Sequence, residues 1–162
     1  MKSMKFTYFA PAALAFATVT LAACSGGTEE AAAPTVDEVA LELSDARLML
    51  PAVSGYPGAI YFTVANTGER NYAIRRADVE GAGNAELHGS MEMDGQMMMD
   101  SVGQVLVNAG ESESFAPGGF HVMVFDLDPA LEAGGSTEMM LTVVGGKKKS
   151  FPVEIRAAGD ER

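Results

Sequence analysis

The chain is poor in cysteine and in histidine. Among its 162 residues there are one cysteine and two histidines. A single thiol cannot form a disulfide within the chain, so the fold has to be held together by packing alone. A zinc site built on several thiolates is excluded for the same reason. The 11 methionines are therefore the main source of sulfur for any soft metal site.

Basic side chains are also scarce. The chain holds 11 lysines and arginines against 22 acidic residues, which gives a formal net charge of −11. Binding to nucleic acid requires a basic face that neutralises phosphates, so this class of partner is excluded. The acidity itself is typical of a protein that has to stay soluble outside the cytoplasm.

The first 23 residues have the features of a lipoprotein signal peptide. Lys2 and Lys5 form a basic start, and the apolar run 6–23 is too short and too interrupted by proline for a convincing membrane span. The run ends in Leu-Ala-Ala-Cys, which resembles the lipobox of bacterial lipoproteins, and Cys24 would then be lipidated and become the mature N-terminus. The alternative is a free thiol in an ordinary signal peptide. Lipidation anchors a protein to a membrane and does not make it span one.

The composition divides the chain into four segments. We expect a signal peptide over residues 1–23, a lipidated cysteine with a flexible tether over 24–36, a β-domain over 37–157 and a polar tail over 158–162. Removal of the signal peptide leaves nine basic and 22 acidic side chains, a formal charge of −13. The remaining 139 residues are enough for one domain with its own core.

Strands are indicated after residue 36, because apolar residues recur with a period of two and no sustained helical stripe is present. In the clearest run, Ile60, Phe62 and Val64 alternate with more polar residues. The other candidate strands are 39–44, 71–79, 85–90, 97–107, 112–116, 120–127, 137–144 and 150–156. About eight or nine short strands joined by turns that contain Gly and Pro predict an all-β sandwich or barrel. Pro152 indicates that the last strand lies at a sheet edge, where Lys147–Lys149 would discourage further pairing.

The segment Glu86–Asp100 is crowded with methionine. Five methionines lie between Met91 and Met99, close to His88, and their plainest role would be to fill a core. Asp94 and Gly95 are a strong signal for a two-residue hairpin turn. Such a turn places Ser90 opposite Met99, so that Met99 is a diagonal neighbour of His88 on the same face. A three-residue turn would reverse this parity.

The second histidine has a methionine beside it. In the strand 120–127 the period of two places His121 and Met123 on one face and Val122 and Val124 on the other. Imidazole with thioether is a soft set of ligands that suits Cu(I), whereas calcium and magnesium prefer oxygen. A blue-copper centre needs a cysteine, and Cys24 belongs to the lipidated terminus. Met49, Met139 and Met140 are interpreted as core residues.

These residues resemble the periplasmic copper chaperones of the PCu(A)C family. The family motif is His, ten residues, Met, twenty-one residues, His-x-Met, and it matches His88, Met99, His121 and Met123 at every spacing. The resemblance extends from about residue 39 to 155, through the strand that ends in Asn-Thr-Gly and the Glu-Leu-His segment. A departure is Asp45-Ala46-Arg47, where many members have Asp-Ala-Trp.

The resemblance implies a cupredoxin-like Greek-key β-sandwich that holds Cu(I) with these four side chains. Met91, Met93 and Met97 are interpreted from the methionine cluster itself as auxiliary ligands or packing residues, and Cu(II) binding is left open. It also implies transfer of copper toward the CuA centre of cytochrome c oxidase, alongside Sco-type proteins, in the periplasm or cell envelope. Whether the inner or the outer membrane carries the anchor stays undecided. No nucleophile, base and orienting group occur together, so we expect a carrier and not an enzyme. The alternatives are copper sequestration, or a β-sandwich interaction module without metal.

Overall fold

The computed structural model describes residues 39–93 and 95–160, and all of its strands lie in the unit Thr35–Arg162. The predicted signal peptide, Cys24 and the whole of the predicted tether lie outside the described residues. Within the described part, no helix has the length and apolar character needed to cross a membrane. The strands are β1 (Leu41–Met49), β2 (Gly58–Asn66), β3 (Tyr72–Val79), β4 (Ala82–Met93), β5 (Gln96–Ser101), β6 (Val105–Val107), β7 (Ser112–Phe115), β8 (Phe120–Leu127), β9 (Ser136–Val143) and β10 (Lys148–Arg156).

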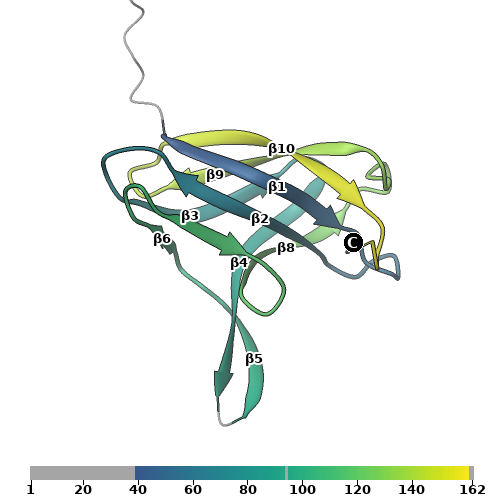
Figure 1. The fold of residues 1–162 in the computed structure, drawn as a ribbon. Helices are drawn as coiled ribbons and strands as arrows, with labels where there is room; N and C mark the ends of the chain where they lie inside the picture. Colours follow the sequence, from purple (N-terminus) through teal and green to yellow (C-terminus); the bar gives the residue numbers. More distant parts are fainter. Residues whose placement is uncertain (1–38, 94, 161–162) are drawn as a thin grey trace, which may run out of the picture. The chain divides into compact units, whose positions relative to one another are not determined.

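All the strands belong to one sheet, in the order β5-β4-β8-β7-β2-β1-β10-β9-β3-β6. Strands that are far apart in this order nevertheless contact each other, β3 with β4 and β2 with β6, so the sheet folds back on itself. Figure 1 shows the resulting layers, with parts of β4 and β5 projecting beyond them. The all-β prediction is confirmed.

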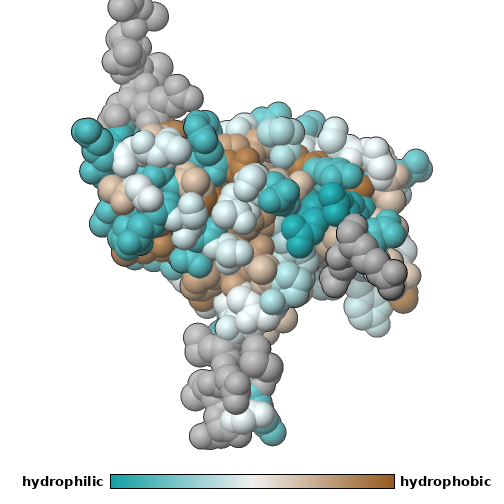
Figure 2. Space-filling model, in the orientation of Figure 1, coloured by the Kyte–Doolittle hydropathy of each residue, from teal (hydrophilic) through white to brown (hydrophobic). Residues whose placement is uncertain are grey.

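The core lies between the layers and follows the predicted alternation. Ile60, Phe62 and Val64 on β2 are at most 1% exposed, and the residues between them are half-buried. The ring of Phe62 stacks on that of Phe115 from β7, with centroids 4.2 Å apart. Burial of each such side chain stabilises the fold by about 1.5–3 kcal/mol. Polar residues cover much of the outside in the same view, with apolar residues visible between them (Figure 2).

The region expected to form one strand over 97–107 is two strands. β5 pairs with β4, whereas β6 pairs with β3, and these two neighbours lie near opposite ends of the sheet order. The chain therefore has to leave one layer and enter the other between Ser101 and Val105. The amide of Val102 marks the departure, because it donates a hydrogen bond to the carbonyl of Leu87 (2.8 Å).

The prediction that Pro152 marks an edge strand is wrong for the strand as a whole, because β10 lies between β1 and β9. The physical reason is local. β1 pairs only with Glu154, Ile155 and Arg156, so the half of β10 that contains Pro152 pairs with β9 alone in the described part. The missing N–H of the proline therefore leaves no gap in a ladder with β1.

β1 extends well beyond its predicted end at Ser44. Its pairing with β2 shifts between Ser44 and Arg47, and Asp45 adopts a φ of +55° there. This irregularity is a β-bulge, which lets the strand bend and then resume pairing. Asp45 and Ala46 therefore lie within the bulge itself.

Candidate metal centre

The hairpin of β4 and β5 has the register that a two-residue turn predicts. Met93 pairs with Gln96 and Ser90 pairs with Met99, and Gly95 has a φ of +77°. Asp94 lies outside the described residues. Met99 is therefore on the same face as His88, in the diagonal position on the neighbouring strand.

The two histidines face each other across adjacent strands. His88 on β4 is directly opposite His121 on β8, and their ring centroids are 5.8 Å apart. This pairing joins residues that are 33 positions apart in the sequence, so no local pattern contains it. His121 is only 4% exposed, so its imidazole lies inside the domain and not on its surface. The structure thus brings together the two imidazoles that the motif contains.

Met123 extends the same face along β8. It is half-buried and lies opposite Glu86, one step along the face from His121. Val122 and Val124, on the other face, are fully buried in the core. The predicted alternation is confirmed.

Met99 and Met123 approach the histidine pair from opposite directions. Relative to His88, Met99 is displaced toward the hairpin turn, whereas Met123 is displaced toward the start of β4. Met99 is 59% exposed and its neighbour Met98 is 52% exposed. The side chains of Met91, Met93 and Met97 lie outside the described part, so their predicted auxiliary role stays a prediction.

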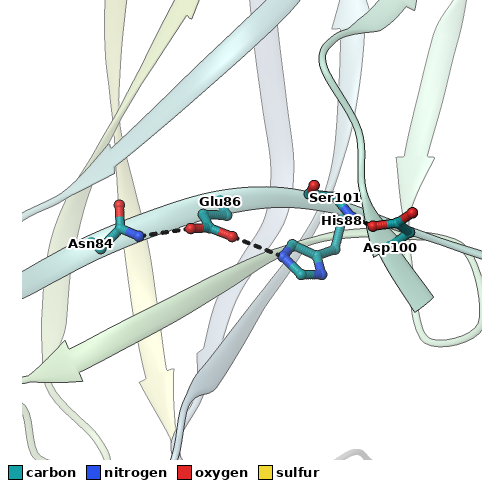
Figure 3. A network of polar contacts seen from close by, with 5 residues as sticks. All are labelled: Asn84, Glu86, His88, Asp100 and Ser101. Carbon is teal, nitrogen blue, oxygen red and sulfur yellow. Dashed lines mark hydrogen bonds and ion pairs between the residues drawn. The ribbon is translucent and has the colours of Figure 1, made fainter.

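A carboxylate that the sequence reasoning did not single out contacts the site. Oε2 of Glu86 lies 3.2 Å from Nε2 of His88, and Oε1 accepts a hydrogen bond from the Asn84 amide (2.9 Å), as Figure 3 shows. The hydrogen bonds from His88 and Asn84 lower the pKa of Glu86 below its ordinary value. The spacing Asn-x-Glu-x-His, which places all three on one face of a strand, was the available signal.

A second contact that sequence reasoning missed comes from β2. The ring of Tyr61 lies 6.2 Å from that of His121, and the guanidinium of Arg47 lies 5.4 Å above the Tyr61 ring. This arrangement is a cation–π contact, in which the guanidinium of Arg47 covers the ring of Tyr61.

The chemistry of the donors is soft. Among the residues that the structure describes, no group of three or more His, Cys, Asp or Glu side chains is arranged to hold a metal ion. A zinc or calcium site would use such a group. An ion bound here would need the thioethers as well as the imidazoles, a set that favours Cu(I).

A comparison with protein-family models shows the family of the chain. A family model described as "Putative lipoprotein LpqE-like" matches residues 41–155. The "Putative lipoprotein Lxx21020" of Leifsonia xyli subsp. xyli is 25% identical over 146 residues, which are 76% of this chain and 88% of that protein.

Two solved structures are also similar. The apo PCuAC domain from PmoF1 is 25% identical, with a TM-score of 0.61, over 75% of this chain and 97% of that domain. The CuI-DR1885 structure from Deinococcus radiodurans is 17% identical, with a TM-score of 0.55, over 83% of this chain and 89% of the other. The expected cupredoxin-like β-sandwich of PCuAC domains is thereby confirmed.

Proposed function

We propose that this chain, which belongs to the LpqE-like lipoprotein family, is an extracytoplasmic Cu(I) carrier that binds copper at His88, Met99, His121 and Met123. The observation that carries the proposal is the opposed pair of imidazoles on β4 and β8, with a thioether diagonal to it on either side. The similarity to a PCuAC domain at 25% identity supports it.

The gradient of exposure across the site supports transfer by ligand exchange. His121 is 4% exposed, whereas Met99 is 59% exposed. A partner's sulfur would therefore displace the Met99 thioether first, and the buried imidazole would leave last. Four uncharged ligands attract a monovalent cation only modestly, so the ion can be released by replacing one ligand at a time. No bond of a substrate is made or broken, which fits a carrier and not an enzyme.

The acceptor and the location are further parts of the proposal. Delivery toward the CuA centre of cytochrome c oxidase, with Sco-type proteins as co-workers, follows from the family resemblance. Lipidation at Cys24 would place the carrier at the cell envelope, and the matched family of lipoproteins supports this. The acceptor would be tested by purifying the CuA subunit from cells with and without the gene and comparing its copper content.

Cu(I) titration tests the binding site. The chain from residue 24, with Cys24→Ser to remove the competing thiol, is titrated with Cu(I) against a chromophoric chelator under anaerobic conditions. We expect one tightly bound ion, and a loss of affinity in each of His88→Ala, His121→Ala and Met123→Ala. Met139→Leu is the matched control, because Met139 is fully buried in the core. Unchanged affinity in the three site variants would overturn the assignment.

Copper sequestration is the second candidate, and one observation favours it. Met98 and Met99 are both more than half exposed on β5, in a hairpin that holds three further methionines. Such a strand offers sulfur on both of its faces. A stoichiometry above one copper per chain, together with normal oxidase assembly in a deletion strain at limiting copper, would favour storage over delivery.

A further inference from the structure

The two histidines of the proposed site contact hydrogen-bond acceptors through different ring nitrogens. Nδ1 of His121 lies 3.2 Å from the carbonyl oxygen of Gly119. A carbonyl oxygen can only accept, so the proton of neutral His121 is on Nδ1 and the lone pair is on Nε2. In His88 the nitrogen that faces an acceptor is Nε2, which lies 3.2 Å from Oε2 of Glu86. The lone pair of neutral His88 is therefore on Nδ1.

Glu86 is itself fixed in place. Its second oxygen, Oε1, accepts a hydrogen bond of 2.9 Å from the side-chain amide of Asn84. Figure 3 shows Asn84, Glu86 and His88 in one row along β4, each reaching toward the next. The three residues alternate along the strand, so the row needs no support from a loop. The carboxylate is thus oriented before any metal arrives.

The free nitrogen of His88 lacks a partner. Nδ1 is buried, and no hydrogen-bond partner for it exists among the described residues. A buried acceptor left without a partner destabilises the folded state, and such groups in native proteins need an explanation. A metal ion bound to Nδ1 provides one, because it would use the lone pair that the carboxylate leaves free.

We propose that copper is bound through Nδ1 of His88 and Nε2 of His121, and that Glu86 is the positioning residue that enforces this mixed pair. The inference rests on the proposed copper site and adds the identity of each donor atom. A carboxylate that accepts the other N–H of a ligating histidine fixes its tautomer and ring orientation and makes it a better donor. The Gly119 carbonyl does the same for His121.

Long-range proton–nitrogen NMR on the 15N-labelled Cys24→Ser chain reads the donor atoms directly. In the apo chain we expect His121 protonated at Nδ1 and His88 at Nε2. After one equivalent of Cu(I), the shifted nitrogens should be Nδ1 of His88 and Nε2 of His121. Copper bound at Nε2 of His88 would overturn this inference alone, whereas no shift at either histidine would overturn the copper site as well.

Variants of Glu86 test the positioning role. Glu86→Ala is expected to lower Cu(I) affinity about 10- to 100-fold, as loss of an outer carboxylate does in other metal sites. Glu86→Gln should retain most of the affinity, because the amide oxygen still accepts from Nε2. Asn84→Ala should fall between them. Glu86→Gln and Glu86→Ala both remove the negative charge, but only Glu86→Ala removes the hydrogen-bond acceptor. A difference in affinity between them therefore reports the orientation of His88 and not the charge.

Glu138→Ala is the matched control. Glu138 is an exposed glutamate on β9, a strand that is not adjacent to β4 or β8, so its loss should leave copper affinity unchanged. Urea denaturation should show that all four variants remain folded. Equal copper affinity in Glu86→Ala and Glu138→Ala would contradict the positioning role. The role would also be contradicted if Glu86→Ala bound copper with wild-type affinity and still through Nδ1 of His88.

Discussion

His88 and His121 are directly opposite each other in the antiparallel pairing of β4 and β8, with ring centroids 5.8 Å apart. Directly opposed residues have Cβ atoms about 4.5–5.5 Å apart, so both imidazoles can reach one ion without any change in the backbone. The thioethers are less well placed, because each lies one diagonal step away in opposite directions. The histidine pair is therefore the prearranged part of the proposed site, which the two methionines would complete.

The two exposed methionines of β5 should behave differently. Met99→Ile removes a thioether from the face of His88, and Met98→Ile removes one from the opposite face. We expect Met99→Ile to weaken Cu(I) binding by roughly tenfold or more, the range in which even outer residues of metal sites act, and Met98→Ile to leave it nearly unchanged. Chelator competition measures both. Equal losses would mean that the ion is not confined to one face.

Methyl NMR can follow the methionines individually. In a chain with 13C-labelled methionine methyl groups, Cu(I) should shift the signals of Met99 and Met123 strongly, because the metal binds the adjacent sulfur. The signal of Met139, which is fully buried on β9, should not move. Shifts confined to Met123 would show that Met99 is not a ligand.

Gly89 is expected to be intolerant of a side chain. A Cβ at this position would lie 3.1 Å from Cγ1 of Val102 and 3.3 Å from the ring of Phe120. Gly89→Ala should therefore lower the free energy of unfolding by about 1–3 kcal/mol, the usual effect of overpacking. It should also weaken copper binding, because Gly89 follows His88 and Phe120 precedes His121. Urea denaturation and copper titration measure the two effects.

The control for this variant is Gly103→Ala. A Cβ at Gly103 meets nothing within 4 Å, so the free energy of unfolding should change by less than about 0.5 kcal/mol. If both variants were equally stable, the close packing of Gly89 against β8 would be contradicted.

Asn66 should stabilise the domain without affecting copper. Its side-chain amide donates to the carbonyls of Arg70 (2.8 Å) and Val107 (3.0 Å), and its Oδ1 accepts from the amide of Gly68 (3.0 Å). Asn66→Ala is expected to lower the free energy of unfolding by about 1–3 kcal/mol, because buried groups lose their partners. Asn66→Asp should be worse, since a carboxylate oxygen would face two carbonyls. Wild-type stability of Asn66→Asp in urea would contradict this account.

Much of the site could be predicted because it is local. The alternation on β8 follows from the period of two, and the register of the β4–β5 hairpin follows from the turn at Asp94 and Gly95. What sequence reasoning missed depends on neighbours in space. Tyr61 approaches His121 only because β2 pairs with β8. Glu86 lay within reach of the same alternation, but its role became visible only through its hydrogen bonds.

The errors have a common cause. The residues of 97–107 predict one strand, because they favour extended backbone throughout. Pro152 predicts an edge strand, because it lacks one hydrogen-bond donor. Neither property says which strands lie alongside, and in both cases the pairing partners change partway along the segment.

The sequence by itself determined the class of fold, the faces of the individual strands and the four candidate ligands, because period, turn residues and donor chemistry are local properties. Only the tertiary structure decided that β4 lies beside β8, that His88 meets His121, and that the Nδ1 of His88 is left free while Glu86 occupies its other nitrogen. Pairing between distant strands is set by how the whole core packs, and the core joins residues from all parts of the domain. The methionine-rich hairpin places Met99 on the same face as His88, and the pairing of β4 with β8 adds His121 to that face. The histidine pair beside Met99 is therefore not contained in any single segment.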